Sequence, residues 1–530
     1  MPLSEPVRVV RELTSHGYNA DREAVTLLAD APDPDAAVAR AVETAPDDVL
    51  TLTAEHVREA LDDIHDADGA DTDTPSDTAS SPDTDAPPDT DDLDTTVSSG
   101  DETTGNPTRM TTSPAETKGD SFDRTVDEAL REVDIAGDIT GRSTGTGEYE
   151  DFVAVFRDRY ERLSKKLRGR VNHRPTDALE QMSGGNDAAV VGMVNDIRST
   201  ASGHWLVELE DTNGTFPALV MKDRDIAELV DEMLLDEVVA VEGSLSSDGG
   251  IIFADNIHFP DVPRNHQVNT ADRHVQAALV SDVHVGSQEF AGEAWSRFTS
   301  WLHTREAEHV EYLLIAGDMV EGVGVYPDQD EELDIVDIYE QYEAFSERLK
   351  EVPGDVEIVL IPGNHDAVRL AEPQPGFDEK LRDIMDVHDP HISGNPSTVT
   401  VEGVDVLMYH GVSIDEMVAE LPEDKASYEK PHRAMYQLLK KRHVAPQFGG
   451  HMRVAPEEKD YLVIDDVPDV FHTGHVHKLG IGTYHNVRCI NSGCWQKQTD
   501  FQKSVNIQPD VATAPILDLD TLEVTVRKFE

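Results

Sequence analysis

Cysteine, aromatic side chains, positive charge and long apolar runs are all scarce in this chain of 530 residues. Its two cysteines, Cys489 and Cys494, cannot build a disulfide framework, and a single Cys-x4-Cys pair is a weak zinc signal, so we expect two small core residues. There is no apolar run of about 18 residues, and the N-terminus lacks a basic start followed by an apolar segment. The sequence therefore predicts a soluble, cytoplasmic protein that makes no membrane contact.

Negative charge dominates the composition. Asp and Glu number 106 against 44 Lys and Arg, which gives a net charge of −62. Such a charge disfavours nonspecific attraction of the whole chain to nucleic acid, and it could mark a disordered, self-repelling protein. The regular apolar segments of the C-terminal half favour another interpretation, a halophilic surface that stays hydrated in a very salty cytosol, where repulsion is screened. Despite the negative charge of the whole chain, a local site on this surface can still bind DNA through metal ions.

The N-terminal part predicts a small helical module and then a linker. Within residues 1–66, four groups of apolar residues recur at helical spacing and are separated by turn residues. A module of this size usually binds a partner, and a solubilising cap is an equal alternative. Residues 67–148 are predicted to form an acidic, disordered linker. The Asp, Thr, Ser and Pro of 67–120 cannot bury enough apolar surface to offset chain entropy, and order is expected to resume near Phe122–Val133 and to be established at Tyr149.

A helix is predicted to begin at Tyr149, in a segment, 149–186, that leads into the folded core. Its basic end, 165–170, either complements the helix macrodipole or contacts a phosphate backbone, and the first alternative is favoured. Residues 187–262 then predict five strands, with one helix between the third and the fourth. This is the order of an OB-fold β-barrel, a common scaffold for single-stranded nucleic acid. Its few strand aromatics, Trp205, Phe216 and Phe253, could stack on bases or fill the barrel, so we expect it to serve protein contact at least in part.

Residues 271–530 predict an α/β domain in which strands alternate with helices and are followed by closely spaced strands, as in a two-sheet sandwich with helices outside. Five apolar strand segments in this domain end in polar residues. They are followed by the phrases Asp282-Val283-His284, Gly317-Asp318, Gly363-Asn364-His365-Asp366, His410-Gly411 and Gly474-His475-Val476-His477. Strand ends hold polar groups rigidly beside a cleft.

These residue types suit a pair of metal ions. Asp282 and His284 lie two apart, so on an extended strand end they should point to one side and chelate one divalent ion. Asp318 has two oxygens and is the natural bridge between two ions. Two ions about 3.5–4 Å apart clamp a phosphodiester and lower the pKa of a bound water. The remaining expected ligands are Asn364, His410, His475 and His477.

His365 is placed to contact the scissile phosphate or protonate the leaving oxygen, with Asp366 orienting its ring. Each motif also has an ordinary explanation, because His-x-His is often plain polarity and Gly-Asp is often a turn. Their joint occurrence, in order and each at a strand end, favours the metal site. His451, His472 and His485 have no comparable context and are expected to be structural.

These motifs together resemble those of the calcineurin-like metallophosphoesterase superfamily. The longer phrases at 317–327, 471–477 and 490–496 are similar to the small subunits of archaeal family-D DNA polymerases. The resemblance covers about 150–530, and the N-terminal module and linker fit its layout without a specific motif. It implies an OB-fold and an α/β/β/α phosphoesterase sandwich in a multidomain α/β chain.

The resemblance also implies a 3′-to-5′ exonuclease that proofreads for a large catalytic subunit, acts on single-stranded DNA 3′ ends, uses two Mn²⁺ or Mg²⁺ ions and has the sliding clamp as a further partner. One ion would be held by Asp282, His284, Asp318 and His477, and the other by Asp318, Asn364, His410 and His475. Related B subunits of eukaryotic polymerases lack these ligands, whereas none is missing here.

Two other functions fit parts of the sequence. A general phosphatase or phosphodiesterase would use the same two-metal chemistry. A scaffold without catalytic activity would only hold a polymerase. The barrel and the polymerase-subunit phrases argue against the first, and the complete ligand set argues against the second.

Overall fold

The computed structural model describes residues 9, 13, 19–20, 22–29, 31, 34–44, 51–53, 56–58, 109–112, 124, 126, 128–143, 147–325, 329–450, 452–504 and 507–530. The chain divides into two compact units, Met1–Ser99 and Gly100–Glu530. None of the helices in the described part is long and apolar enough to cross a membrane.

In the first unit, helices α2 (Arg22–Ala29) and α3 (Pro34–Thr44) share an apolar core that includes Val25, Leu28 and Val38. Two of the four predicted helices are therefore present, and the other two fall mainly outside the described residues. A two-residue parallel pair, β1 (Asn19–Ala20) with β2 (Thr51–Leu52), was not predicted.

The prediction of a disordered linker at 67–148 is wrong for the helix and the strands that the structure describes between 109 and 136. Strand β3 (Arg109–Thr112) pairs with the C-terminal strand β20, and β4 (Val133–Ala136) pairs with β14. Between them lies the short helix η1 (Glu128–Leu130). Val133 and Ile135 pack against the sandwich core, so a sheet edge supplies the apolar surface that this segment lacks by itself.

The predicted five-strand barrel is present, and its strands are antiparallel except for the parallel pair β7–β9. Its order is β5-β6-β7-β9-β8. The elements of this region are α5 (Tyr149–Arg168), α6 (Thr176–Leu179), β5 (Asp187–Ser199), β6 (Trp205–Asp211), β7 (Gly214–Val220), η2 (Asp225–Glu232), β8 (Val238–Leu245) and β9 (Ile252–His258). Phe216 fills the barrel and Trp205 packs against its core, whereas Phe253 is 41% exposed.

The rest of the second unit contains two sheets. The seven-stranded sheet has the order β13-β12-β11-β10-β19-β20-β3, and the six-stranded sheet has the order β17-β18-β16-β15-β14-β4. The strands are β10 (Gln276–Val280), β11 (Val310–Ala316), β12 (Glu357–Ile361), β13 (His391–Ile392), β14 (Ser397–Val401), β15 (Val404–Met408), β16 (Val470–Thr473), β17 (Leu479–Tyr484), β18 (Val487–Ser492), β19 (Thr513–Asp518) and β20 (Val524–Lys528).

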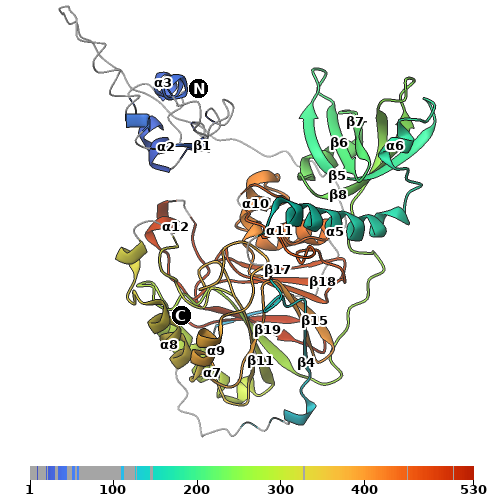
Figure 1. Cartoon of the computed structure of the whole chain (residues 1–530). Coiled ribbons are helices and arrows are strands. Elements are labelled where there is room, and N and C mark those ends of the chain that lie inside the picture. The colour runs from blue at the N-terminus through green and yellow to red at the C-terminus, as the bar shows by residue number, and fades with distance from the viewer. Residues whose placement is uncertain are drawn as a thin grey trace, which may run out of the picture. The chain divides into compact units, whose positions relative to one another are not determined.

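The two sheets are packed face to face with helices outside (Figure 1). Leu279 and Leu314 of one sheet meet Val406 and Ile490 of the other in the central core. Because β10, β11 and β12 are covered on both faces, their sequences are almost continuously apolar. The helices are α7 (Gly292–Leu302), η3 (Arg305–Ala307), η4 (Gln329–Glu332), α8 (Ile338–Leu349), α9 (Glu379–Ile384), α10 (Ser413–Glu420), α11 (Pro431–Lys441) and α12 (Asp500–Ser504).

The helices cover the outer faces of the two sheets. Trp295 of α7 and Phe345 of α8 cover the outer face of the seven-stranded sheet. Met417 of α10 and Leu438 of α11 cover the six-stranded sheet. The resulting order is helices, sheet, sheet, helices.

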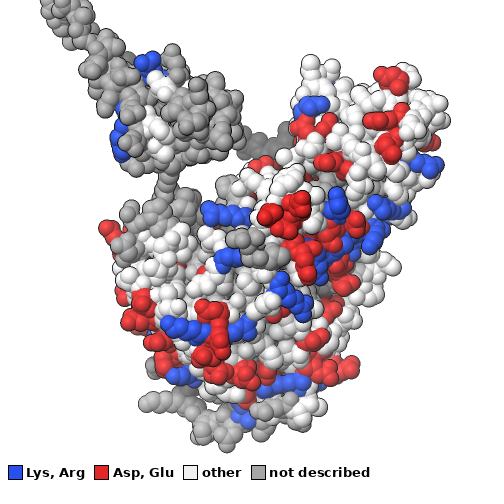
Figure 2. All heavy atoms as spheres, in the orientation of Figure 1, with Lys and Arg blue, Asp and Glu red and all other residues white. Residues whose placement is uncertain are grey.

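Helix α5 joins the barrel to the sandwich. Tyr160 and Leu163 pack on barrel strands, while the guanidinium of Arg159 is fully buried and lies 2.7 Å from the carboxylate of Asp460. A second fully buried pair, Glu237 of the barrel and Lys441 of α11, has its charged atoms 3.0 Å apart. Figure 2 shows basic and acidic atoms gathered together in the region of α5. Arg162 of this helix pairs with Asp158 and Asp465.

Candidate metal centre

The side chains expected to bind metal all follow strand ends of the two facing sheets. Asp282 and His284 follow β10, Asp318 follows β11, and Asn364 follows β12. His410 follows β15, and the pair His475 and His477 follows β16. Strands β10, β11 and β12 are parallel neighbours, and so are β15 and β16, so the carboxyl ends of each group meet at one edge of its sheet.

The backbone at these positions differs from the predicted extended geometry. Asp282 and His284 have φ of 53° and 55°, in the left-handed region, and Asp318, His475 and His477 have φ of 53°, 71° and 54°. The prediction that period-two spacing on an extended strand aligns Asp282 with His284 is therefore wrong in its reason. The two side chains converge because the chain turns sharply after Val280. Such conformations are uncommon outside glycine and concentrate at functional sites.

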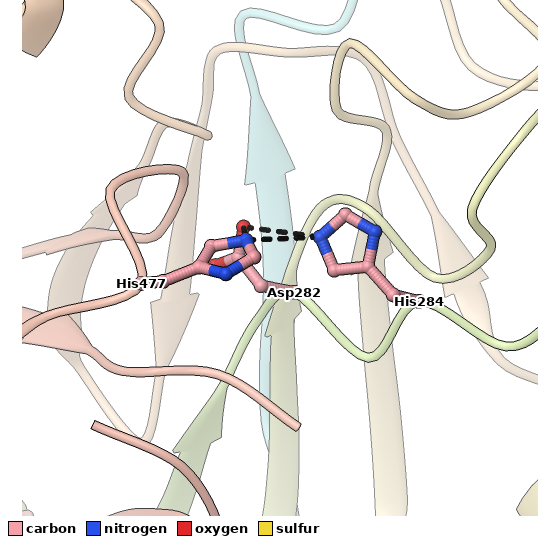
Figure 3. Close-up of side chains that lie close together, drawn as sticks. All are labelled: Asp282, His284 and His477. Atoms are coloured by element: carbon pink, nitrogen blue, oxygen red, sulfur yellow. Dashed lines mark hydrogen bonds and ion pairs between the residues drawn. The ribbon is translucent and has the colours of Figure 1, made fainter. Parts of the chain in front are cut away.

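Asp282, His284 and His477 form the first cluster, shown in Figure 3. The Nε2 atoms of His284 and His477 lie 3.0 Å apart. Asp282 Oδ1 lies 3.4 Å from Nε2 of His477 and 3.9 Å from Nε2 of His284. All three residues are buried.

Asp318, His410 and His475 form the second cluster. Nε2 of His410 lies 3.1 Å from Asp318 Oδ2 and 3.0 Å from Asn364 Oδ1. Asp318 Oδ2 is also 3.8 Å from Nε2 of His284, which belongs to the first cluster. The Asp318 carboxylate thus stands between the two groups, as its expected bridging role requires.

The donor set fits two divalent ions. With metal–ligand bonds of about 2.0–2.2 Å, two ligands of one ion lie roughly 3–4 Å apart, which is the range of the spacings above. Imidazole and carboxylate donors together suit Mn, Fe or Zn, and they do not decide among these ions.

The electrostatics of the centre favour cations. Burial opposes ionisation of Asp318, but the imidazoles of His410, His365 and His284 hold its pKa well below the usual range. Burial alone would lower the pKa of His410, yet the charge of Asp318 raises it to about 10. Buried carboxylates that draw protons onto neighbouring histidines will also draw metal ions in their place.

Each candidate ligand histidine has a further partner at one ring nitrogen. Nδ1 of His284 lies 2.9 Å from the carboxylate of Glu321, and Nδ1 of His410 lies 2.8 Å from the carbonyl oxygen of Ala316. His477 Nδ1 is 2.8 Å from the Gln502 amide, and His475 Nε2 is 2.9 Å from the Asp415 carboxylate. Partners of this kind fix the tautomer and the direction of a metal-binding imidazole.

Sequence reasoning missed Glu321, Asp415 and Gln502. Only Glu321 carried a signal, because it lies inside the Gly317-to-Gly322 phrase. Gln496 in turn donates to the Glu321 carboxylate at 2.7 Å. It belongs to the 490–496 phrase, which the sequence analysis noted without giving it a role.

His365 lies at the same centre, and its ring contacts that of His284 edge to face. Its Nδ1 is 2.8 Å from the carbonyl oxygen of Glu321, so Nε2 is the atom that can exchange a proton. The predicted role of Asp366 is wrong. Its carboxylate accepts from the backbone N–H of Asp318 and Gly363 and from the Tyr342 hydroxyl, so it fixes the two loops rather than the His365 ring.

The other histidines and cysteines of the sequence analysis have structural surroundings where they are described. His472 is buried, and burial lowers its pKa to about 3, so its ring is neutral. His485 contacts the carbonyl oxygen of Val262 at 3.0 Å, and His451 lies outside the described residues. Cys489 and Cys494 are free and buried, as expected.

Comparisons with known proteins agree with the sequence phrases. The family model for the B subunit of DNA polymerases alpha and epsilon matches residues 277–479. The DNA polymerase II small subunit of Halobacterium salinarum is 66% identical over 531 residues, which is 100% of both chains. That of Archaeoglobus fulgidus is 43% identical over 71% of this chain and 76% of its own length.

A solved archaeal phosphodiesterase aligns with 48% of this chain and 98% of its own at 15% identity, but its TM-score of 0.25 is too low to bear on the fold. The full-length match to the halobacterial protein is the decisive one. This chain belongs to the family of DNA polymerase II small subunits, the small subunits of archaeal family-D DNA polymerases.

Proposed function

We propose that this small subunit is a two-metal 3′-to-5′ exonuclease that proofreads for a large, DNA-synthesising subunit. The observation that carries the proposal is the convergence of seven candidate ligands from five strand ends. Neighbouring donor atoms of six of them lie 3.0–3.9 Å apart, and His475 offers a donor within 4.8 Å of those of Asp318 and His410. We assign Asp282, His284, Asp318 and His477 to one ion and Asp318, Asn364, His410 and His475 to the other, with Mn²⁺ or Mg²⁺ as the ions.

Bound there, two divalent ions would lower the pKa of a nucleophilic water and balance charge on the phosphate. The protein's own acid is His365. Its Nδ1–H donates to the Glu321 carbonyl, which directs Nε2 towards the centre to protonate the leaving 3′ oxygen. His365 contacts the His284 ring, so acid and metal ligand belong to one packed unit.

The architecture supports this assignment. We interpret the closed barrel as an OB-fold and the layered sandwich as calcineurin-like, a pairing that suits a nuclease delivered to DNA by a partner. The partners we propose are the large polymerase subunit, single-stranded 3′ ends of DNA and the sliding clamp.

The test compares substrates. With Mn²⁺ and the large subunit present, we expect removal of nucleotides from single-stranded DNA and faster removal from a mismatched than from a matched 3′ end. A small phosphate ester should be a poor substrate. Efficient hydrolysis of the ester, with no preference among DNA ends, would instead favour a general phosphodiesterase.

His365→Ala separates catalysis from scaffolding. We expect this variant to lose nuclease activity while it still copurifies with the large subunit. If the wild type and the variant degrade DNA equally poorly, the exonuclease assignment fails and the scaffold remains.

A further inference from the structure

The two oxygens of the Asp282 carboxylate have different surroundings. Oδ2 accepts a short hydrogen bond from the hydroxyl of Ser281. The backbone N–H of His475 lies 3.0 Å from both oxygens. Oδ1 is the oxygen that faces His284 and His477, so it is the one turned to the first metal cluster.

The Ser281 hydroxyl is the end of a longer buried chain. Its Oγ lies 2.8 Å from Oγ of Ser492, and that atom lies 3.2 Å from Nε2 of His472. Asp282 and His472 are 0% exposed, and the two serines are 1% exposed. The chain therefore joins a candidate metal ligand to a histidine that the proposed reaction does not use.

One atom of this hydrogen-bonded series lacks a partner, and it decides which group donates at each step. Nδ1 of His472 is buried and has no hydrogen-bond partner among the described residues. A buried N–H without an acceptor costs more than an idle lone pair, so the proton belongs on Nε2. His472 then donates to Ser492, Ser492 donates to Ser281, and Ser281 donates to Asp282, which aligns every dipole towards the carboxylate.

We propose that His472, acting through Ser492 and Ser281, is a positioning residue that holds Asp282 so that only Oδ1 faces the metal. The proposal rests on the proposed metal centre and adds to it a residue that the sequence analysis considered merely structural. It also gives a role to the phrases at 471–477 and 490–496, because His472 lies in the first and Ser492 in the second.

Packing around the chain agrees with this role. A Cβ placed on Gly474 would lie 2.4 Å from both Asp282 Oδ2 and Ser281 Oγ. Only a glycine at this position leaves room for the serine hydroxyl against Oδ2. The arrangement thus gives Oδ2 a hydroxyl donor that Oδ1 lacks and leaves Oδ1 turned to the ion.

The test measures metal binding rather than catalysis. Full-length chain freed of metal is titrated with Mn²⁺ in a calorimeter. We expect His472→Leu and Ser492→Ala each to weaken one of the two Mn²⁺ sites by about tenfold or more, the usual cost of losing an outer partner of a metal ligand. His472→Gln should restore most of the affinity, because the glutamine amide can donate near the position of Nε2.

Two controls make the outcome decisive. Ser164→Ala removes a buried hydroxyl on α5, whose partner is the carbonyl of Glu161, and should leave both Mn²⁺ affinities unchanged. The double variant His472→Leu/Ser492→Ala should be no weaker than either single one, because each cuts the same chain.

Unchanged Mn²⁺ affinity in Ser492→Ala, or glutamine and leucine variants that bind equally weakly, would overturn the positioning role. Ser492→Ala removes a single oxygen, so the test stands even if a larger change at His472 unfolds the chain. If the wild type itself binds no Mn²⁺, the metal centre is wrong and this inference falls with it.

Discussion

Several of the residues with a strained backbone lie at the candidate metal centre. Asp282, His284, Asp318, His475 and His477 all have positive φ, although none is a glycine. Each such conformation costs of order 1 kcal/mol or more, and it persists only because the surrounding strands impose it. The candidate ligands are thus held in place at the expense of local backbone stability.

Asp318→Asn tests whether that position serves the ion or the fold. Asparagine tolerates the left-handed region, and its amide oxygen can still accept from the His365 N–H, which lies 2.8 Å from Asp318 Oδ1. We expect Mn²⁺ affinity and nuclease activity to fall by at least about 100-fold, since a ligand matters at least as much as its outer partners. Without metal the melting temperature should also fall, because the Asp318 carboxylate pairs with the protonated His410 ring in the empty site, so a fall in stability with unchanged Mn²⁺ affinity would assign Asp318 to the fold alone.

Glu372 gives a pH-dependent prediction. Burial raises the pKa of its carboxyl to about 7, against 4.5 for an ordinary Glu, while the hydrogen bond from the Tyr409 hydroxyl opposes the rise. Between these values the folded protein holds one more proton than the unfolded chain, so its stability falls as pH rises from about 4.5 to 7 and levels off above.

Glu372→Gln removes this titration. The wild type should lose on the order of 3 kcal/mol of unfolding free energy relative to the variant between pH 5 and 8. Urea unfolding in EDTA at four pH values measures the difference. Parallel curves for the two proteins would show that Glu372 is ionised in the fold at every pH tested.

The sequence predicts which side chains meet here better than how they are held. All seven candidate ligands converge as expected, because each follows an apolar strand and strand ends gather at one edge. The partners of their second nitrogens come from distant segments, such as Gln502 on α12 and Asp415 on α10, and no local pattern indicates them. Asp366 follows His365 directly, yet its carboxylate turns to backbone amides, which spacing alone does not reveal.

At the scale of elements, the order of most strands and helices can be predicted from the sequence, whereas the strands at the edges of the two sheets cannot. Apolar alternation and turn residues predict the barrel with the helix η2 in its place. Strands β3 and β4 were not predicted, because neither has enough apolar residues to be stable by itself. Each is stable only when it pairs with a strand that lies hundreds of residues later in the sequence.

Arg159 provides a test of how α5 is fixed. Burial would raise the pKa of Asp460, but His443 and Arg159 hold it far below the usual range. Arg159→Met leaves that carboxylate with one fewer cation, so we expect a loss of about 3–5 kcal/mol in unfolding free energy by urea titration.

Arg198→Met is the matched control. Arg198 pairs with Asp196 at 2.8 Å, but its side chain is 59% exposed, so its loss should cost no more than about 1 kcal/mol. Equal costs for the two variants would contradict the role given to the buried pair.

At the scale of the whole molecule, the net charge makes the free energy of unfolding depend on the salt concentration. A net charge of −62 repels itself in the compact state, and KCl shortens the screening length from about 10 Å at 0.1 M to about 3 Å at 1 M. We expect the unfolding free energy to rise steeply over this range. Tetramethylammonium chloride should act equally if screening is the cause, and stabilisation by KCl alone would point to bound K⁺ instead.

The edge strands β3 and β4 have a consequence for biosynthesis. β3 joins its sheet only through β20, which lies far later in the sequence, and β19, next to the central β10, begins at Thr513. A growing chain therefore displays an open edge at β10 until β19 and β20 have been synthesised. Its earlier segments must be kept from associating with other chains until those two strands are available.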